Sequence, residues 1–219
     1  MLTQLLLLAI TSNCPEVQLQ TDPPVNLTEY SRASWYIQQQ QVNGYQSPNE
    51  LYCVTATYNF DNHSKVPLFS GKVLSVYNYA TFNSSHGPSL NGNNSMILCA
   101  RQPNSSHPEM LLVAPCFLPN LFGGDYWILA AGPNSTNYEW AVVIGGQPSV
   151  RVSNTTCTTS LKGFNGSGLW IFSRNQTMDH GLLDSIRVLI NQRGISTDYL
   201  LNVTQSGCNY TGAFLKHNH

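Results

Sequence analysis

The side chains in this 219-residue chain that could do chemistry are chiefly its six cysteines and six histidines. No Cys-x-x-Cys pair occurs, and the histidines are scattered through expected loops and the tail, so no metal site is predicted. No Ser, His and Asp set and no pair of carboxylates stands out, and an even cysteine count leaves no evident nucleophile. The sequence therefore predicts three disulfide bonds, of undetermined connectivity, and no enzyme. The cysteines are Cys14, Cys53, Cys99, Cys116, Cys157 and Cys208.

Low charge and many glycosylation sequons indicate a secreted glycoprotein. Charged residues make up 10% of the chain, against about 25% in an ordinary soluble protein. The net charge of -1, without a basic run, argues against binding to nucleic acid or to an anionic membrane surface. Sequons begin at Asn26, Asn62, Asn83, Asn93, Asn104, Asn134, Asn154, Asn165, Asn175, Asn202 and Asn209.

The N-terminal apolar run from Leu5 to Ile10 has the length of a signal-peptide core, although an N-terminal strand is the alternative. No later run is long enough for a transmembrane helix. We therefore expect a signal-peptide remnant over residues 1–13, a single domain over 14–210 and a flexible tail over 211–219.

The chain from residue 35 onward reads as strands separated by turn residues. An extended arm over 15–24 precedes them, because its prolines disfavour a helix. An edge strand over 199–204 is a further candidate. The main strands are expected at 35–41, 51–59, 71–77, 96–101, 110–114, 125–131, 138–144 and 169–173.

A single amphipathic helix is predicted after the last main strand. Asp179 lies near its start, where a carboxylate is favourable, and Arg193 and Gly194 mark its end. Its apolar face must pack on the outside of the sheet. That face consists of Leu182, Leu183, Ile186, Leu189 and Ile190.

Two tryptophan-bearing apolar strands, at Trp35 and Trp170, suggest a sheet that returns to its start and closes into a barrel. First and last strands would then be neighbours, so we predict that the Arg174 guanidinium covers the Trp35 ring. The alternative is a core tryptophan and an unrelated surface arginine. In the second strand, period-two patterning puts Val54, Ala56 and Tyr58 on one apolar face, which would line the barrel if it is hollow.

A set of short motifs follows in order along the chain: Cys14-Pro15, Trp35-Tyr36, Tyr52 to Tyr58, Gly71-Lys72-Val73, Tyr126 to Ala130, Leu169 to Asn175 and Cys208. In this order the motifs resemble those of the lipocalins, and most closely those of the branch of apolipoprotein D and the insect bilin-binding proteins. The resemblance covers nearly all of the chain between Cys14 and Cys208. It implies an all-β fold: an eight-stranded antiparallel up-and-down barrel, or calyx, with one C-terminal helix packed outside and one end closed by Trp35 and Arg174.

The resemblance also implies disulfide partners and ligand-binding residues. It pairs Cys53 with Cys208 and Cys14 with Cys157, which leaves Cys99 with Cys116. It matches Trp127 and Trp170 to pocket tryptophans, and period two adds Leu129 and Phe172 to the same face. Polar groups for a ligand could come from the hydroxyls of Tyr58 and Tyr138.

The expected function is that of a secreted, glycosylated lipocalin that binds and transports a small hydrophobic ligand. Bilin, carotenoid, retinoid, sterol and fatty acid all suit an aromatic calyx, and no cofactor is required. One alternative is a packed core without a cavity. Others are a glycoprotein that scavenges or docks through the loops over 83–95 and 145–168, and, as a minority hypothesis, a lipocalin-fold enzyme. The sequence leaves a receptor and a homo-oligomer open.

Overall fold

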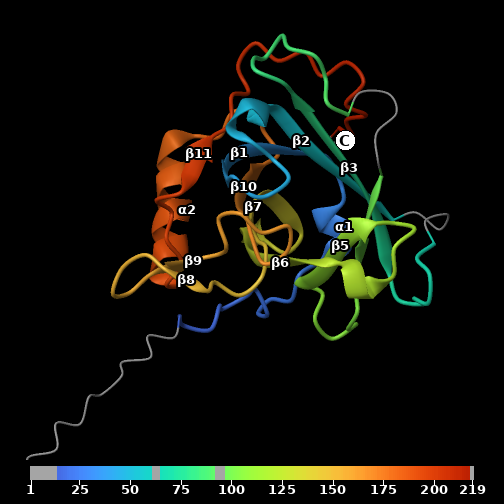
Figure 1. Ribbon diagram of the computed structural model, residues 1–219, viewed down its shortest axis with the longest axis vertical. Coiled ribbons are helices and arrows are strands. Elements are labelled where there is room, and N and C mark those ends of the chain that lie inside the picture. Colours follow the sequence, from blue (N-terminus) through green and yellow to red (C-terminus); the bar gives the residue numbers. More distant parts are fainter. Residues whose placement is uncertain (1–13, 61–64, 92–96, 218–219) are drawn as a thin grey trace, which may run out of the picture.

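The computed structural model describes residues 14–60, 65–91 and 97–217. In these residues nine antiparallel strands form one sheet, and eight of them close into a barrel because β10 pairs with β1. The predicted fold class, an eight-stranded antiparallel barrel with one C-terminal helix outside it, is confirmed (Figure 1). The barrel strands are β1 (Trp35–Gln41), β2 (Tyr52–Phe60), β3 (Val73–Thr81), β4 (Leu98–Arg101), β5 (Met110–Pro115), β6 (Gly124–Asn134), β7 (Asn137–Ile144) and β10 (Leu169–Ser173).

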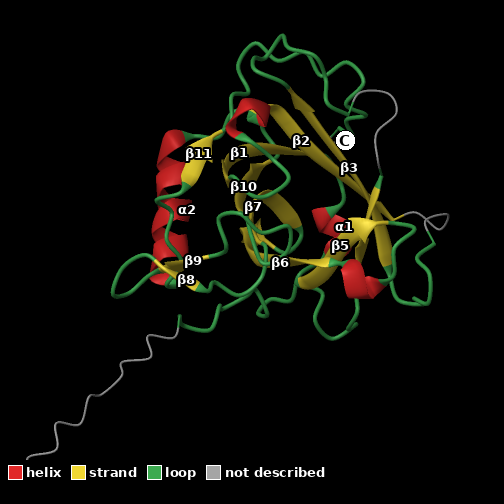
Figure 2. Cartoon of the chain, viewed as in Figure 1, coloured by secondary structure: helices red, strands yellow, loops and turns green. Residues whose placement is uncertain are grey.

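The remaining elements are short, apart from one helix that lies beside the barrel (Figure 2). That helix starts where predicted, since Asp179 caps it by accepting a bond from the backbone N–H of Leu182 at 2.9 Å. β11 pairs with β1 as the predicted edge strand. These elements are α1 (Leu27–Tyr30), η1 (Pro48–Glu50), η2 (Asn120–Phe122), β8 (Val150–Arg151), β9 (Cys157–Thr158), α2 (His180–Gln192) and β11 (Leu200–Asn202).

Alternation along the strands separates two apolar clusters. The interior cluster lies inside the barrel and includes Trp35, Ile37, Val54, Tyr58, Leu74, Ala100, Leu111, Ile128, Val143 and Phe172. The helix cluster lies between α2 and the outer face of the sheet and includes Leu129, Val142, Ile144, Leu169, Ile171, Ile186 and Ile190.

One end of the barrel is closed by α1, which the sequence analysis did not predict. Asn26 caps this helix: its side-chain oxygen accepts bonds from the backbone N–H groups of Thr28 and Glu29, at 3.1 and 3.2 Å. The cap places the ring of Tyr30 5.2 Å from that of Trp35, and both side chains are completely buried. Four residues are too few to show helical periodicity, so the pattern could not reveal this helix.

Arg174 completes the closed end. Its guanidinium lies 3.3 Å from the centroid of the Trp35 ring, the arrangement that the sequence predicts. It donates hydrogen bonds to the backbone carbonyls of Glu29, Tyr30 and Tyr138, at 3.0, 3.0 and 3.1 Å. Burial, and secondarily the positive charge of Arg32, lowers the pKa of Arg174 to about 9. The guanidinium therefore joins α1, β7 and β10 beneath Trp35.

Three disulfide bonds hold the connections between strands. They are Cys14–Cys157, Cys53–Cys208 and Cys99–Cys116, the pairs that the resemblance implies, with Cα separations of 5.8, 5.5 and 4.9 Å. The first bond ties down the N-terminal arm, the second ties the C-terminal segment to β2, and the third links β4 to the segment after β5. No free cysteine occurs among the described residues.

The segment predicted to be a flexible tail contacts the barrel in the part that the structure describes, residues 211–217. The backbone N–H of Ser34 donates to Lys216 O at 2.8 Å, and Lys216 N donates to Ser34 Oγ at 2.8 Å. Ala213 is completely buried, and Phe214 packs edge-on against Tyr77. Composition alone could not show these contacts, because they depend on the Cys53–Cys208 bond, which brings the segment back to the barrel.

Some predictions lie outside the described residues: the signal-peptide remnant and the sequons at Asn62 and Asn93. In the rest of the chain, none of the helices is both long and apolar enough to cross a membrane.

Candidate ligand-binding site

The burial of side chains inside the barrel differs between its two ends. At the closed end Tyr30 and Trp35 are completely buried. At the other end Leu51 and Ala80 are buried, but several side chains that pack against the interior cluster are only partly buried. Solvent therefore reaches apolar side chains inside the barrel from one end, which we call the open end. The partly buried residues there are Val42, Leu98, Val113 and Trp170.

Trp170 takes its place at the open end because Gly168 has no side chain. Gly168 has a φ of +106°, and a Cβ there would lie 2.0 Å from an atom of the Trp170 ring. Only glycine meets both requirements. Across the sheet, Trp170 is the direct partner of Gln40 on β1 and of Val143 on β7.

Three tyrosines from three different elements join their hydroxyl groups inside the barrel. The Tyr126 hydroxyl lies 2.6 Å from that of Tyr30 and 2.7 Å from that of Tyr58. Burial raises the pKa of each, and the neighbouring tyrosines add to the rise for Tyr30 and Tyr126. Tyr126 is the partly buried member, so this tyrosine cluster presents a neutral polar group to the interior.

A tyrosine titration would test this arrangement. We expect Tyr58→Phe and Tyr126→Phe to leave the tyrosinate absorbance that develops up to about pH 11 unchanged, because buried hydroxyls keep their protons beyond the ordinary pKa of about 10. The measurement is near-ultraviolet absorbance against pH, with circular dichroism to verify that the protein remains folded. A smaller signal in either variant would show that the cluster ionises like an exposed tyrosine.

The inward positions of the described barrel strands carry no Asp, Glu, Lys or His. Arg174 is the charged group that acts on the tyrosine cluster, and its bonds go to backbone carbonyls at the closed end. Among the described residues, no group of three or more His, Cys, Asp and Glu side chains could hold a metal ion. The interior thus offers apolar surface and neutral hydrogen-bonding groups.

The expectation that Trp127 and Leu129 face the interior is wrong. Both pack in the helix cluster beneath α2, whereas Tyr126 and Ile128 point inward. The run over 125–131 is apolar on both faces, so hydrophobicity could not decide which alternate set points inward. Trp127 and Trp170 are therefore on opposite faces of the sheet.

The other residues proposed to bind a ligand belong to the interior, at different depths. Val54 and Tyr58 come from β2, and Phe172 packs 6.0 Å from the Trp35 ring at the closed end. Ala56 pairs directly with Trp35. Tyr138 is completely buried near α1, where its hydroxyl accepts a bond from the backbone N–H of Asn26 at 3.1 Å. The sequence did not predict Tyr30, Tyr126 and Gln40 as site residues, because no periodic pattern shows that their side chains point inward.

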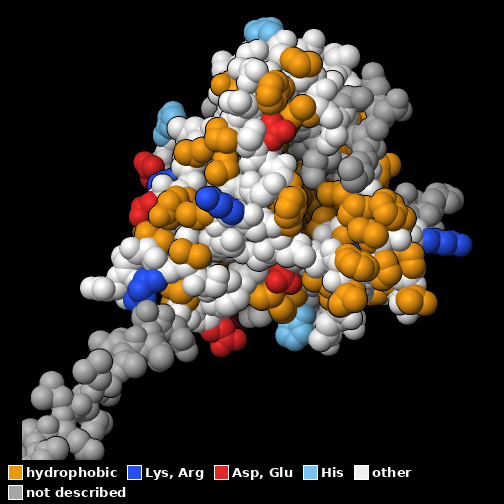
Figure 3. All heavy atoms as spheres, viewed as in Figure 1, with side chains coloured by type: hydrophobic (Ala, Val, Ile, Leu, Met, Phe, Trp, Pro, Cys, Tyr) orange, Lys and Arg blue, Asp and Glu red, His pale blue; other side chains and the backbone are white. Residues whose placement is uncertain are grey.

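Exposed apolar side chains gather over β5 and η2 (Figure 3). Phe117, Leu121 and Phe122 are 72%, 88% and 57% exposed. The segment that carries them is held by Arg101, a completely buried residue that donates to the carbonyls of Pro115 and Leu118, at 2.9 and 2.8 Å. We call Phe117, Leu121 and Phe122 the apolar patch.

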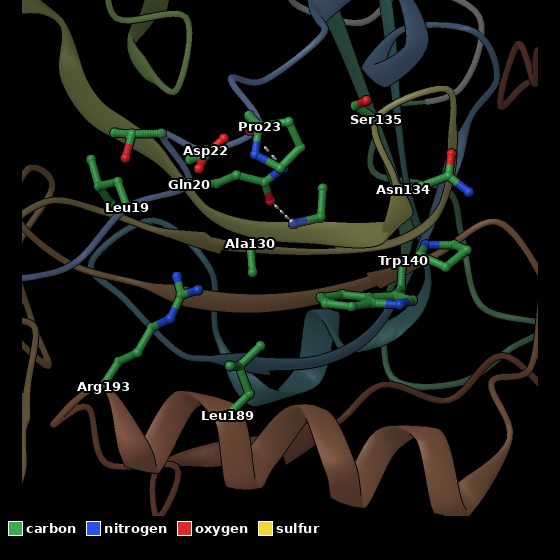
Figure 4. A pocket seen from close by; sticks show the side chains of 13 residues that line it. Leu19, Gln20, Asp22, Pro23, Ala130, Asn134, Ser135, Trp140, Leu189 and Arg193 are labelled. Atoms are coloured by element: carbon green, nitrogen blue, oxygen red, sulfur yellow. Dashed lines mark hydrogen bonds between the residues drawn. The ribbon is translucent and has the colours of Figure 1, made fainter.

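A hollow of about 300 Å³ lies outside the barrel, between the arm at 19–23, the β6–β7 hairpin and α2. In Figure 4 the Trp140 ring and the Arg193 guanidinium border it from opposite sides, and Gln20 accepts a bond from the backbone N–H of Ala131 at 2.5 Å. The sequon residue Asn134 lies on its rim. This outer pocket is a separate site from the interior.

No protein-family model matches the chain, and no curated protein matches it. Several solved structures match it in fold. The cockroach major allergen Per a 4 is 14% identical over 91% of this chain and 97% of its own, with a TM-score of 0.52. Apocrustacyanin C1 is 17% identical over 89% of this chain and 86% of its own, with a TM-score of 0.54. Lobster apocrustacyanin A1 is 19% identical over 87% of this chain and 84% of its own, with a TM-score of 0.52. These structures are lipocalins, and the likeness shows that the chain has the lipocalin fold.

Proposed function

We propose that this protein binds a small hydrophobic molecule inside its barrel and transports it. The observation that carries the proposal is the graded interior: apolar, sealed by Arg174 and Trp35 at one end, and partly solvent-accessible around Trp170 at the other. An eight-stranded barrel is just wide enough for one small ligand. The structures that share the fold are lipocalins, a family whose members bind small hydrophobic ligands, which supports the same role here.

Burial of apolar surface would drive binding, at about 25 cal/mol per Å² before the costs of association are subtracted. Val54, Tyr58 and Trp170 would contact the ligand, with the tyrosine cluster as a polar boundary. Bilin, carotenoid, retinoid, sterol and fatty acid are the ligand classes we consider. Within the lipocalins, the motif order favours the apolipoprotein D and bilin-binding branch.

Secretion and glycosylation belong to the same proposal. Three disulfide bonds are typical of proteins that fold in an oxidising compartment. Every sequon asparagine that the structure describes is exposed, as attachment of a glycan requires. These are Asn26, Asn83, Asn104, Asn134, Asn154, Asn165, Asn175, Asn202 and Asn209.

The apolar patch favours a second candidate function, docking to another macromolecule through a surface loop. Exposed clusters of large apolar side chains often mark interaction sites. The patch lies within a stretch without sequons, from residue 105 to residue 133, so no N-linked glycan would be attached to that stretch. Docking and ligand transport are compatible, and they are separated by the experiment below.

The test is to purify the protein from its native source, record its absorption spectrum and identify extracted molecules by mass spectrometry. We expect a stoichiometric apolar compound. A visible absorption band with a tetrapyrrole or carotenoid would indicate a pigment carrier, and a colourless protein that yields a sterol or fatty acid would indicate a lipid carrier. A protein that yields nothing and whose tryptophan fluorescence no apolar compound quenches would contradict transport and leave docking through the apolar patch.

A further inference from the structure

Gln40 is the polar side chain at the inward face of β1 near the open end. It is the direct cross-strand partner of Trp170. Residues directly opposite each other in a sheet share a face, so Gln40 points into the barrel as Trp170 does. Its side chain is completely buried. An amide in that position must find its hydrogen-bond partners inside the barrel or in the loop that covers it.

The covering loop satisfies only one end of this amide. Gln40 Nε2 donates to Gln46 Oε1 at 2.8 Å. Gln46 in turn donates from its own Nε2 to the backbone carbonyl of Glu50 at 3.5 Å. The Glu50 carbonyl can only accept, so the Gln46 amide directs its nitrogen to Glu50 and its oxygen to Gln40. The Gln40 amide therefore donates from its nitrogen, and its Oε1 is left without a partner.

Gln40 Oε1 has no hydrogen-bond partner among the described residues, and it is shielded from solvent. A buried acceptor left unpaired is costly, and a donor brought by a ligand would remove that cost. The polar group at the inward face near Trp170 is therefore a hydrogen-bond acceptor without a donor.

The rest of the interior determines what charge the ligand can carry. The inward strand positions offer tyrosine hydroxyls, this amide and the amide of Asn78, which lies opposite Ala56, with no Lys or His to pair an anion. The guanidinium of Arg174 is occupied at the closed end by backbone carbonyls. A carboxylate taken out of water without a counter-ion is strongly disfavoured, whereas an uncharged hydroxyl is not.

We propose that the interior selects an uncharged, hydroxyl-bearing hydrophobic ligand, whose hydroxyl proton is accepted by Gln40 Oε1. The inference rests on the proposed function and narrows it from hydrophobic molecules in general to alcohols. The matching carboxylic acid lacks a counter-ion here, and the matching ether or aldehyde has no proton to donate. The hydrocarbon part of the ligand provides the affinity, and Gln40 provides the preference for an alcohol over the matching acid, ether or aldehyde.

The experiment compares ligands that share one hydrocarbon body. One series is 1-dodecanol, methyl dodecyl ether and dodecanoic acid, and a second is retinol, retinal and retinoic acid. Equilibrium dissociation constants are measured by tryptophan quenching for the full chain, for Gln40→Met and for the control Gln39→Met. Gln39 is the neighbouring glutamine, but its amide bonds Asn202 and Arg187 on the outer face of the barrel, at 2.6 and 2.7 Å.

We expect the native protein to bind the alcohol of each series about tenfold more tightly than the ether, the aldehyde or the acid. Gln40→Met should remove the advantage of the alcohol and change the dissociation constants of the ether and the aldehyde by no more than about twofold. Gln39→Met should change none of the dissociation constants by more than about twofold. Equal affinity for alcohol and ether in the native protein would overturn the inference and leave transport standing. A Gln40→Met variant that weakens every ligand equally would also overturn it. Failure of all six compounds to bind would contradict the proposed function itself.

Discussion

Replacing Trp35 by alanine is expected to lower the free energy of unfolding by about 3 to 5 kcal/mol. The ring is completely buried, and its Nε1 donates to the carbonyl of Tyr30 at 3.0 Å. Its loss would open a cavity beneath α1 and remove the aromatic face on which the Arg174 guanidinium lies. Chemical denaturation monitored by circular dichroism would measure the change.

Phe117→Ala is the matched control, because it also removes an aromatic ring but at a position that is 72% exposed. A surface substitution of this kind changes stability by about 0.5 kcal/mol or less. Similar losses of unfolding free energy in the two variants would contradict the assignment of Trp35 to the closed end. A strong loss for Trp35→Ala alone would support it.

Replacing Trp170 by alanine should weaken binding of an apolar ligand about 30-fold while the fold is retained. The estimate takes the burial of one large side chain against a ligand as about 2 kcal/mol. Trp170 is the partly buried tryptophan of the interior, so its ring can contact a ligand that enters from the open end. Titration with an apolar ligand would give the dissociation constants.

Trp127 and Trp140 provide the matched controls on the same measurement. Both pack in the helix cluster on the outer face of the sheet, and Trp140 also borders the outer pocket. Their replacement by alanine should reduce stability and leave the dissociation constant within about twofold. If Trp140→Ala weakened binding and Trp170→Ala did not, the ligand would bind in the outer pocket.

The barrel and its outer helix could be predicted because their signals are periodic. Apolar runs that carry a tryptophan define the strands at 35–41 and 169–173, which have the bounds found, and the apolar face around Ile186 defines α2. The disulfide pairs followed from the resemblance rather than from spacing. Where a strand is apolar on both faces, as β6 is around Trp127, the pattern cannot say which face is inward.

Parts of the site depend on contacts that have no local pattern. Tyr30 reaches the interior from α1, a helix of one turn, and Tyr126 meets it from another part of the chain. The importance of Gln40 appears only from its bonds to the loop after β1 and from its unpaired oxygen. Side chains that act through long-range partners of this kind are visible in the structure alone.

The central claim, that an apolar ligand occupies the barrel interior, is tested most directly by photo-crosslinking. A dodecanol that carries a diazirine on its hydrocarbon chain would be bound, irradiated and located by peptide mass spectrometry. We predict that the label attaches to residues of the interior, such as Val54, Leu98 or Trp170. Label confined to the apolar patch at Phe117 to Phe122, or to the outer pocket around Trp140, would contradict the claim.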